Sequence, residues 1–484
     1  MPRLASQPFL SDRAAKALVF GTSFCVLVLE ILAGRLLAPL IGVSLETFTG
    51  IIGTVLAGIA LGNSVGGRMA DSTDASTLLG PTILAGGALT WIAPLVTSAL
   101  GPVGNADPIT IVFLAAITFF GPAAVLSAVT PMVAKLRLGD LDNTGRVVGS
   151  LSAAGTAGAL AGTFLTGFVL VAAFPTRQLI FGVGAILVLV GAILTGRSRI
   201  TKNLTSVVVV AVLGVGALTS SGPCDAETAY ACVQIVPDPE RQTGRSLVLN
   251  GTRNSYVDLV DPSFLDFRYM RLFADVAAGL PTGPVDALHL GGAGFTYPRH
   301  LNTVRPGSTG TVLEIDAELI DVAVDDLGLE ISETMEIISG DARLSIGELD
   351  DDSYHLIVGD AFSGLTIPWH LTTVEFVREL DRVLRPDGVV VANLIDGGEV
   401  EFARAAMSTY RSSFEHVALV VPDGGIRDRG RNLIMIASHE ELPSFDIDPS
   451  DGHLLTAAET NDLIDDAAVL TDDFAPVDQL RLGP

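Results

Sequence analysis

The sequence predicts two structural parts, a bundle of about seven membrane-spanning helices over residues 1–222 and a soluble α/β part over the rest of the 484 residues. The first observation is a mean hydropathy of +0.51, which is too high for a soluble protein and comes from the first part. The second is charge: residues 1–222 contain 12 Lys+Arg and 8 Asp+Glu, and residues 223–484 contain 17 and 46, giving net charges of +4 and −29. The third is that strand-like apolar runs alternate with helical segments in the second part, which is typical of a doubly wound, mainly parallel sheet.

The first part contains seven apolar stretches, most of which reach the length of about 20 residues that a helix needs to cross a bilayer. They cover residues 17–37, 47–69, 78–100, 109–134, 148–172, 177–196 and 204–221, and the last is the shortest. The protein is therefore expected to be an integral membrane protein with the lipid bilayer as a partner.

Basic residues at alternate loops predict the orientation of the bundle, because cytoplasmic loops carry an excess of Lys and Arg. They are Arg3, Arg13 and Lys16 before the first helix, Lys135, Arg137 and Arg146 after the fourth, and Arg197, Arg199 and Lys202 after the sixth. This pattern places the N-terminus in the cytoplasm. Seven crossings then place the soluble part outside the cytoplasm, whereas six would place it inside.

Polar residues in and beside the helices give three further expectations. Cys224 and Cys232 follow the last helix, and outside the cytoplasm they would form a disulfide, the alternative being two free thiols. Cys25 lies within the first helix and is expected to pack there. Glu30 is costly at membrane depth; it could face a substrate path, but we favour a pair with Arg35.

Small-residue spacings at Gly58-x-x-x-Gly62 and Gly158-x-x-x-Gly162 allow helices to approach closely. In a bundle of many helices this favours internal packing over a dimer contact, although a homodimer stays open.

A small β-meander is predicted over residues 223–262, ahead of a Rossmann-like domain over residues 263–484. Alternating strands flank Asn250-Gly251, a dipeptide that favours a tight hairpin turn.

The Rossmann-like domain is organised around a strand, a glycine turn, a helix and a second strand. The apolar run 287–290 leads into Gly291, Gly292 and Gly294, and a helix is expected to start near Pro298. The second strand, 310–315, contains Glu314, about 20 residues after the glycines. Glycines let a backbone approach a ligand, and an acid at this place can accept ribose hydroxyls, so the unit predicts a nucleoside site. The alternative is a tight turn that binds nothing.

The remaining elements continue the alternation of strand and helix. We expect helices over 264–280, 321–327 and 373–383, strands over 335–339, 354–360 and 389–394, a turn at 385–388, and a loop over 361–369. Glu314, Asp341 and Asp360 each lie where a strand ends. Since ligands bind at the carboxyl ends of strands in such sheets, we expect these three acids to form one site.

The acidity of the second part excludes nucleic acid as a partner, because like charges repel. A cationic ligand such as a polyamine would be attracted, although adaptation to high salt or a bias in base composition explains the charge equally well. His289, His300 and His355 lack the spacing of metal ligands, so no metal is predicted.

Over about residues 228–400 the chain resembles the spermidine synthase (polyamine aminopropyltransferase) family, in its membrane-fused form. Two helix segments, Leu29-Glu-Ile-Leu-Ala-Gly-Arg-Leu-Leu-Ala-Pro39 and Gly58-Ile-Ala-Leu-Gly-Asn-Ser-Val-Gly-Gly-Arg68, look like the membrane part of that group. The resemblance implies a β-hairpin domain before a methyltransferase-like sheet.

The resemblance also implies roles for individual residues. Gly291, Gly292 and Gly294 match the glycine motif beside decarboxylated S-adenosylmethionine, and Glu314 matches the acid on its ribose. Asp341-Ala342 matches the pair that holds the adenine, and Asp360 matches the base that deprotonates the attacking amine. Tyr269 matches a substrate-side tyrosine, without the His and Glu that accompany it in the family. Trp369 and His370 could contact the substrate or pack the loop.

One departure concerns the donor. The family motif Gly-Gly-Gly-Asp-Gly carries an acid that grips the cofactor's amine, whereas this chain has Gly291-Gly-Ala-Gly-Phe295. Decarboxylated S-adenosylmethionine, S-adenosylmethionine, another ligand or none therefore stay open.

The sequence thus supports one main hypothesis and two alternatives. The main one is a membrane-anchored transferase that moves an aminopropyl or related group from an S-adenosylmethionine-type donor to a small-molecule amine, as in polyamine biosynthesis. In the first alternative, an extracytoplasmic domain of the same fold acts on a cell-surface glycan or lipid without that cofactor. In the second, a non-catalytic ligand-binding or polyamine-sensing domain is attached to a membrane bundle such as a transporter.

Overall fold

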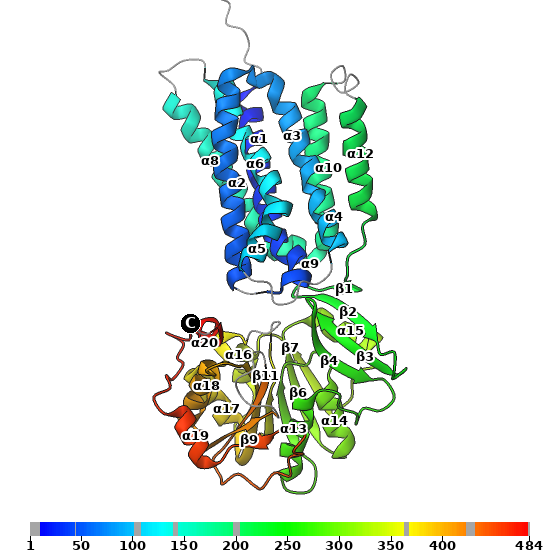
Figure 1. The fold of residues 1–484 in the computed structure, drawn as a ribbon, viewed down its shortest axis with the longest axis vertical. Helices are drawn as coiled ribbons and strands as arrows, with labels where there is room; N and C mark the ends of the chain where they lie inside the picture. Colours follow the sequence, from blue (N-terminus) through cyan, green and yellow to red (C-terminus); the bar gives the residue numbers. More distant parts are fainter. Residues whose placement is uncertain are drawn as a thin grey trace, which may run out of the picture. The chain divides into compact units, whose positions relative to one another are not determined.

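The computed structural model describes residues 10–43, 45–100, 108–138, 144–196, 204–362, 367–422 and 431–482. The chain divides into two compact units, Met1–Cys232 and Val233–Pro484, whose elements are drawn in Figure 1. Some residues of the sequence-based expectations lie outside the described ranges. They are the basic residues Arg3, Arg197, Arg199 and Lys202, and residues 363–366 of the predicted loop.

The first unit is helical, as predicted. In the described ranges its helices are α1 (Asp12–Ile41), α2 (Leu45–Ser72), α3 (Ala75–Thr90), α4 (Ile92–Ala99), α5 (Pro108–Ala115), α6 (Gly121–Ser127), α7 (Val129–Arg137), α8 (Thr144–Leu165), α9 (Val171–Ala173), α10 (Thr176–Thr195) and α12 (Leu204–Thr219), with π-helical turns at Ala116–Phe120 and Thr166–Leu170. Joined end to end, these form six helical spans in the described residues that are long and apolar enough to cross a membrane. The seventh predicted stretch forms a helix, α12, but it has only 16 residues.

Glycines bring the helices of this unit into close contact. A Cβ atom on Gly58 or Gly62 of α2 would collide with the backbone of the segment Phe120–Ala124. A Cβ atom on Gly158 of α8 would collide with the Phe20 carbonyl of α1. Both small-residue spacings are therefore used for packing inside the bundle, as expected.

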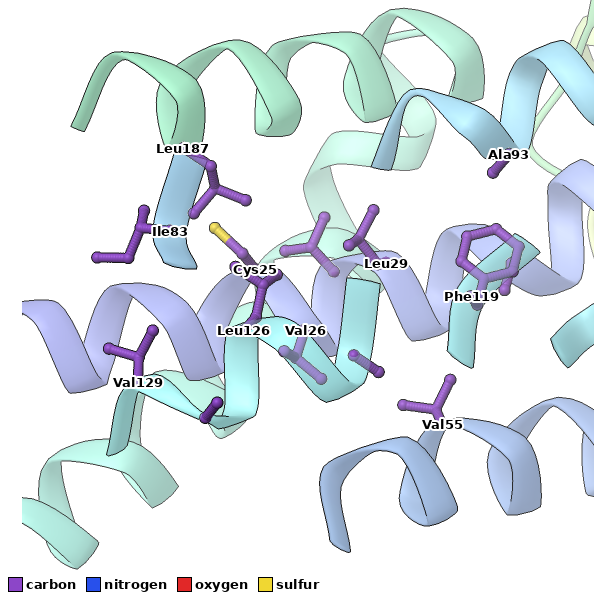
Figure 2. Packing of buried hydrophobic residues seen from close by; sticks show 14 of the residues in the cluster. Cys25, Val26, Leu29, Val55, Ile83, Ala93, Phe119, Leu126, Val129 and Leu187 are labelled. Carbon is purple, nitrogen blue, oxygen red and sulfur yellow. The ribbon is translucent and has the colours of Figure 1, made fainter. Parts of the chain in front are cut away.

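A continuous apolar core fills the bundle (Figure 2). Cys25 of α1 is buried and unoxidised, and it lies near Leu29 of the same helix and near Ile83, Leu126 and Leu187 of the surrounding helices. The prediction that Cys25 is a packing residue is confirmed.

The predicted pair between Glu30 and Arg35 is wrong. The Arg35 guanidinium instead binds Glu227, with Nη2 and Oε1 3.2 Å apart, and Nε donates to the Thr176 hydroxyl. Glu227 is held in reach because the Cys224–Cys232 disulfide, predicted from the sequence, closes the segment around it. The same carboxylate accepts the backbone N–H of Thr176 at the start of α10, where an acid is favoured by the helix dipole.

A four-stranded antiparallel meander follows, in the order β1 (Ala226–Glu227), β2 (Cys232–Pro237), β3 (Gly244–Leu249) and β4 (Thr252–Asp258). Asn250 and Gly251 connect β3 and β4 with φ angles of 50° and 80°. Two successive left-handed residues define the turn type that suits a twisted hairpin, so the sequence signal is confirmed.

The second unit is built on an eight-stranded sheet. Its strands are β5 (Asp286–Leu290), β6 (Thr309–Glu314), β7 (Met335–Ser339), β8 (Tyr354–Gly359), β9 (Leu384–Asp396), β10 (His416–Val421), β11 (Arg431–Ser438) and β12 (His453–Leu454). The spatial order is β12-β10-β11-β9-β8-β5-β6-β7, with β5 to β9 parallel and the other strands antiparallel. From β5 the chain builds outward to β6 and β7 and then crosses to β8, so the gap between β5 and β8 is the switch point at which such sheets bind ligands.

Helices cover both faces of this sheet. They are α13 (Arg268–Gly279), α14 (Thr296–Val304), α15 (Ala317–Asp326), α16 (Ala342–Ser345), α17 (Val374–Val383), α18 (Glu401–Arg411), α19 (Ala457–Ile464) and α20 (Val477–Leu482). Side chains of β5 alternate between two cores: Ala287 packs with Phe273 of α13, whereas Leu288 and Leu290 pack with Phe376 of α17. The strand is buried on both faces, which is why its residues 287–290 are apolar apart from the buried His289.

The largest differences from the predicted boundaries concern two helix starts and one turn. Helix α13 starts at Arg268 rather than at residue 264, and α15 starts at Ala317 rather than at 321, because the Asp316 side chain caps its first turn. The predicted turn at 385–388 lies within β9, since Leu384 pairs with Tyr354 and pairing resumes at Val389 after a register shift.

Candidate active site

The predicted site residues follow the carboxyl ends of four neighbouring strands. Gly291 follows β5, Glu314 ends β6, Asp341 comes two residues after β7, and Asp360 follows β8. Because these strands are parallel neighbours, the four positions lie along one edge of the sheet. The edge includes the switch point between β5 and β8.

The glycine turn passes directly over the end of β8. Gly291 has a φ angle of +90°, and its N–H donates to the Leu313 carbonyl at 2.9 Å. A Cβ atom on Gly291 would lie 2.7 Å from the carbonyl oxygen of Asp360. Glycine is therefore needed here both for the left-handed backbone and for the close approach to Asp360.

Glu314 holds this turn in place. Its Oε2 accepts the N–H groups of Gly292 at 2.8 Å and Ala293 at 3.1 Å, while Oε1 accepts the N–H of Asp316 at 2.9 Å. A carboxylate offers about four lone-pair directions, so one direction on Oε1 is left for a ligand. The ribose role of Glu314 stays a prediction, and the structure adds a second task, that of ordering the glycine turn.

Phe295 occupies the space beside the turn. The residue is fully buried with a φ angle of +54°, and a Cβ atom on Gly292 would lie 2.7 Å from its ring. Gly294 is equally confined, because a Cβ atom there would lie 2.7 Å from the Ser255 hydroxyl of β4. Phe295 and Ser255 thus exclude side chains at two of the three predicted glycines.

Asp360 is half-buried and receives two side-chain hydrogen bonds. The Tyr269 hydroxyl of α13 donates to Oδ2 at 2.9 Å, and Nδ2 of Asn393 on β9 donates to Oδ1 at 3.0 Å. Burial raises the pKa of Asp360 to about 6, and the hydrogen bonds from Asn393 and Tyr269 oppose that rise. A carboxyl with this pKa can exchange a proton near neutral pH, which suits a general base.

Tyr269 completes this arrangement. Burial first, and then the Asp360 carboxylate, raise the pKa of Tyr269 well above its usual value, so its hydroxyl stays protonated and donates. Its ring packs against Phe267 and Phe273, each with ring centroids 5.6 Å away. The structure therefore brings the predicted substrate-side tyrosine to the predicted base.

Asn393 was not among the residues predicted from the sequence. Its only signal is a polar side chain, 4% exposed, within the apolar run Val389–Ile395. Such a residue is as often found in a structural hydrogen bond as in an active site, so the sequence alone did not single it out.

Asp341 and His370 form a second cluster further along the edge. Asp341 caps α16 through a hydrogen bond from the Arg343 N–H at 2.8 Å, and its other oxygen lies 3.2 Å from His370 Nε2. Ala342 is buried, whereas the Trp369 side chain is 50% exposed and meets the His370 ring edge-on. The structure brings Asp341 and His370 together and leaves a large aromatic surface available at Trp369.

Within the described residues, no three His, Cys, Asp or Glu side chains come together as metal ligands. His289 is fully buried with no hydrogen-bond partner for either ring nitrogen among the described residues, and burial lowers its pKa to about 3. It is therefore neutral and packs against Tyr297.

The pKa of Asp360 predicts how the stability of the protein depends on pH. The pKa of Asp360 is 3.8 in the unfolded chain and about 6 in the folded one. Protonation of Asp360 therefore stabilises the fold, and this contribution is complete below about pH 4. That contribution is lost as the pH rises through 6, at a cost of up to about 3 kcal/mol. Asp360→Asn lacks this titration, so we expect its melting temperature to rise relative to the wild type between about pH 4.5 and about pH 7.5. A difference in melting temperature that is independent of pH would contradict the shift.

Comparisons with known proteins bear on the second unit. No protein-family model matches the chain. A polyamine aminopropyltransferase from Vibrio vulnificus is 29% identical over 237 residues, which cover 44% of this chain and 76% of the relative. Over this stretch the chain is similar in sequence to a polyamine aminopropyltransferase.

Two further relatives have the same description. A probable polyamine aminopropyl transferase from Bifidobacterium longum is 28% identical over 192 residues, 39% of this chain and 42% of the relative. A polyamine aminopropyltransferase from Chromobacterium violaceum is 30% identical over 155 residues, 32% of this chain and 59% of the relative. These matches confirm the resemblance inferred from the motifs.

Solved structures were also compared with the chain. A probable spermidine synthase from Corynebacterium glutamicum is 27% identical, with a TM-score of 0.49, and the match covers 52% of this chain and 96% of that one. A spermidine synthase in complex with the transition-state analogue AdoDATO is 16% identical, with a TM-score of 0.36, over 53% of this chain and 86% of that one.

Proposed function

We propose that the second unit is a transferase of the aminopropyltransferase type, which moves an aminopropyl group from an S-adenosylmethionine-type donor to a small-molecule amine. The observation that carries the proposal is the Asp360 carboxylate. It lies half-buried at the switch point, accepts hydrogen bonds from Tyr269 and Asn393, and has its backbone in contact with the glycine turn at Gly291. The sequence relatives described as polyamine aminopropyltransferases support the same reaction.

Asp360 supplies the step that an amine acceptor requires. An aliphatic amine is protonated at neutral pH, so its nitrogen has no free lone pair until a base removes a proton. Asp360 accepts that proton, and the nitrogen then forms a bond to the donor's carbon as the carbon–sulfur bond breaks and its electron pair stays on sulfur. A sulfonium donor supplies the leaving group, so the protein contributes mainly position and a proton acceptor.

The edge of the sheet fits the nucleoside part of such a donor. Glu314, at the end of β6, keeps one acceptor direction on Oε1. Asp341 and Ala342 lie just after β7, the next strand along this edge. No residue of Gly291–Phe295 is an acid, and Gly294 stands where the family motif has its Asp, so the turn offers no carboxylate to an amino group. The proposal therefore keeps two donors, decarboxylated S-adenosylmethionine and S-adenosylmethionine, which differ at this end of the molecule.

The test is product analysis with the full-length protein in detergent. Each of the two donors is incubated with a diamine, and the products are identified by mass spectrometry. We expect an amine that has gained an aminopropyl group, formed only with the decarboxylated donor, together with methylthioadenosine. Formation of a methylated amine would keep the transferase and change the transferred group, whereas no amine-dependent product from either donor would contradict the proposal.

The location of the second unit is a separate proposal. The Cys224–Cys232 disulfide is typical of an oxidising compartment. It agrees with seven crossings, in which the 16-residue helix α12 also spans the membrane, whereas the six longer spans alone would place the second unit in the cytoplasm. We infer that the first unit is embedded in the cell membrane with its N-terminus in the cytoplasm and the second unit outside. An extracytoplasmic location favours the alternative function, action on a surface glycan or lipid, because an adenosyl donor would be scarce there.

Thiol labelling of intact cells tests this location. After treatment with a membrane-impermeant reductant, a membrane-impermeant maleimide is expected to label the wild type but not the double variant Cys224→Ser/Cys232→Ser. Both proteins keep Cys25, which is buried and serves as the internal control. Labelling that occurs only after permeabilisation would place the second unit in the cytoplasm.

A further inference from the structure

Two asparagines form a chain behind Asp360 that the sequence did not reveal. Asn432 of β11 donates from Nδ2 to Oδ1 of Asn393 at 2.9 Å, and Asn393 of β9 donates from Nδ2 to Oδ1 of Asp360 at 3.0 Å. The chain crosses three strands that are neighbours in the sheet, β11, β9 and β8. It ends on the carboxylate to which the proposed function assigns proton transfer.

The chain has a direction. An ionised carboxylate only accepts hydrogen bonds, so Asn393 must turn its NH2 end toward Asp360 and its oxygen away. Asn432 meets that oxygen with its own NH2 end. If Asn393 flipped, its NH2 would face the NH2 of Asn432 and its oxygen would face the Asp360 carboxylate. Both contacts would be repulsive, so Asn432 holds Asn393 in the donating orientation.

The other elements around Asp360 make contacts that differ from the one made by the two asparagines. Helix α13 presents Tyr269, whose hydroxyl donates to the other carboxylate oxygen. Strand β5 presents the Leu290 carbonyl, which binds the backbone N–H of Asp360 rather than its side chain. The charged residues of β9 and β11 nearest this point are Asp396 and Arg431, which are opposite each other in the strand register, beyond the asparagines. The Asp396 carboxylate accepts the backbone N–H groups of Gly397 and Ala403.

We propose that Asn393 and Asn432 are positioning residues, in which Asn432 fixes the orientation of the Asn393 amide so that Asn393 always presents an N–H group to Asp360. A neutral Asp360 could instead donate its proton to a flipped Asn393, and Asn432 opposes this flip. The chain therefore favours the ionised form of Asp360, the form that accepts a proton from the amine. The catalytic meaning rests on the proposed function, but the orientation of the amide does not.

Infrared spectroscopy of the full-length protein in detergent tests this proposal without any substrate. The carboxylic acid band of Asp360, identified by its loss in Asp360→Asn, is titrated in wild type, Asn393→Leu, Asn432→Leu and the double variant. Loss of a hydrogen bond to a charged group is expected to raise the midpoint in Asn393→Leu by about one to two pH units. Asn432→Leu is expected to raise it by about half a unit to one unit. The double variant should match Asn393→Leu alone, because Asn432 acts through Asn393.

Ser438→Ala is the matched control. Ser438 is a buried residue of β11, the strand of Asn432, and its hydroxyl donates to the Gly388 carbonyl at 3.0 Å, away from the two asparagines. It is expected to lower the melting temperature and leave the Asp360 midpoint unchanged. Asn432→Ser replaces Asn432→Leu if the leucine variant does not fold, with a smaller shift in the same direction.

An unchanged midpoint in the Asn432 variants, or shifts of the two single variants that add in the double variant, would overturn the proposal. Non-additive shifts in a protein that transfers nothing would keep the amide chain and reject the proposed reaction, so the two failures are distinguishable.

Discussion

Asp360→Asn is expected to reduce transfer to the amine by about 10²- to 10⁴-fold, the usual contribution of a general base. The variant keeps the size of the side chain and can still accept the Tyr269 hydroxyl, but it has no basic oxygen. Because the donor is held by other residues, its binding should change little. The measurement is the initial rate of methylthioadenosine release, together with calorimetry of methylthioadenosine binding to the same preparations.

Tyr269→Phe is the control for this variant. It removes one hydrogen bond to Asp360 and keeps the ring between Phe267 and Phe273, so the rate is expected to fall less than in Asp360→Asn. A rate in Asp360→Asn within a few-fold of the wild type would assign proton transfer to another group.

Glu314→Ala is expected to weaken binding of methylthioadenosine by about 100-fold or more. Two effects combine, since the variant loses a charged acceptor at the nucleoside site and releases the N–H groups of Gly292 and Ala293 that the carboxylate holds. Hydrogen bonds to a charged group contribute about 1.5–3 kcal/mol each, so the loss of one ligand contact already accounts for a large part of this change. Calorimetry with the full-length protein measures it directly.

Asp325→Ala provides a matched loss of charge on the helix that follows Glu314. Asp325 is exposed on α15, and its removal should leave the binding constant unchanged. If Glu314→Ala bound methylthioadenosine as tightly as the wild type, Glu314 would have only its role in ordering the turn.

Much of the fold of the second unit follows from local patterns. The strand at 335–339 was predicted with the observed bounds, because a short apolar run between turn residues has few other stable forms. The turn expected at 385–388 was misplaced, since its Pro-Asp-Gly composition is typical of turns but the flanking residues pair with β8. In the first unit, the partner of Arg35 is 192 residues away at Glu227, and no local pattern could favour it over Glu30.

The residues of the candidate site likewise divide into those that local patterns predict and those that depend on the three-dimensional arrangement. Glu314, Asp341 and Asp360 could be predicted because acids at the ends of parallel strands meet at one edge. Asn393 and Asn432 could not, because no local pattern distinguishes them and their hydrogen bond depends on the order of β8, β9 and β11 in the sheet. The second task of Glu314, holding the glycine turn, likewise depends on the three-dimensional path of residues 291–294.

The pH dependence of kcat/KM for the amine tests most directly the claim that the half-buried carboxyl of Asp360 accepts the proton. The account predicts a rate that falls tenfold per pH unit below about pH 6 and levels off above it, because the pKa of Asp360 is about 6 in the folded protein. A profile that stays flat from about pH 5 to about pH 7 would contradict it.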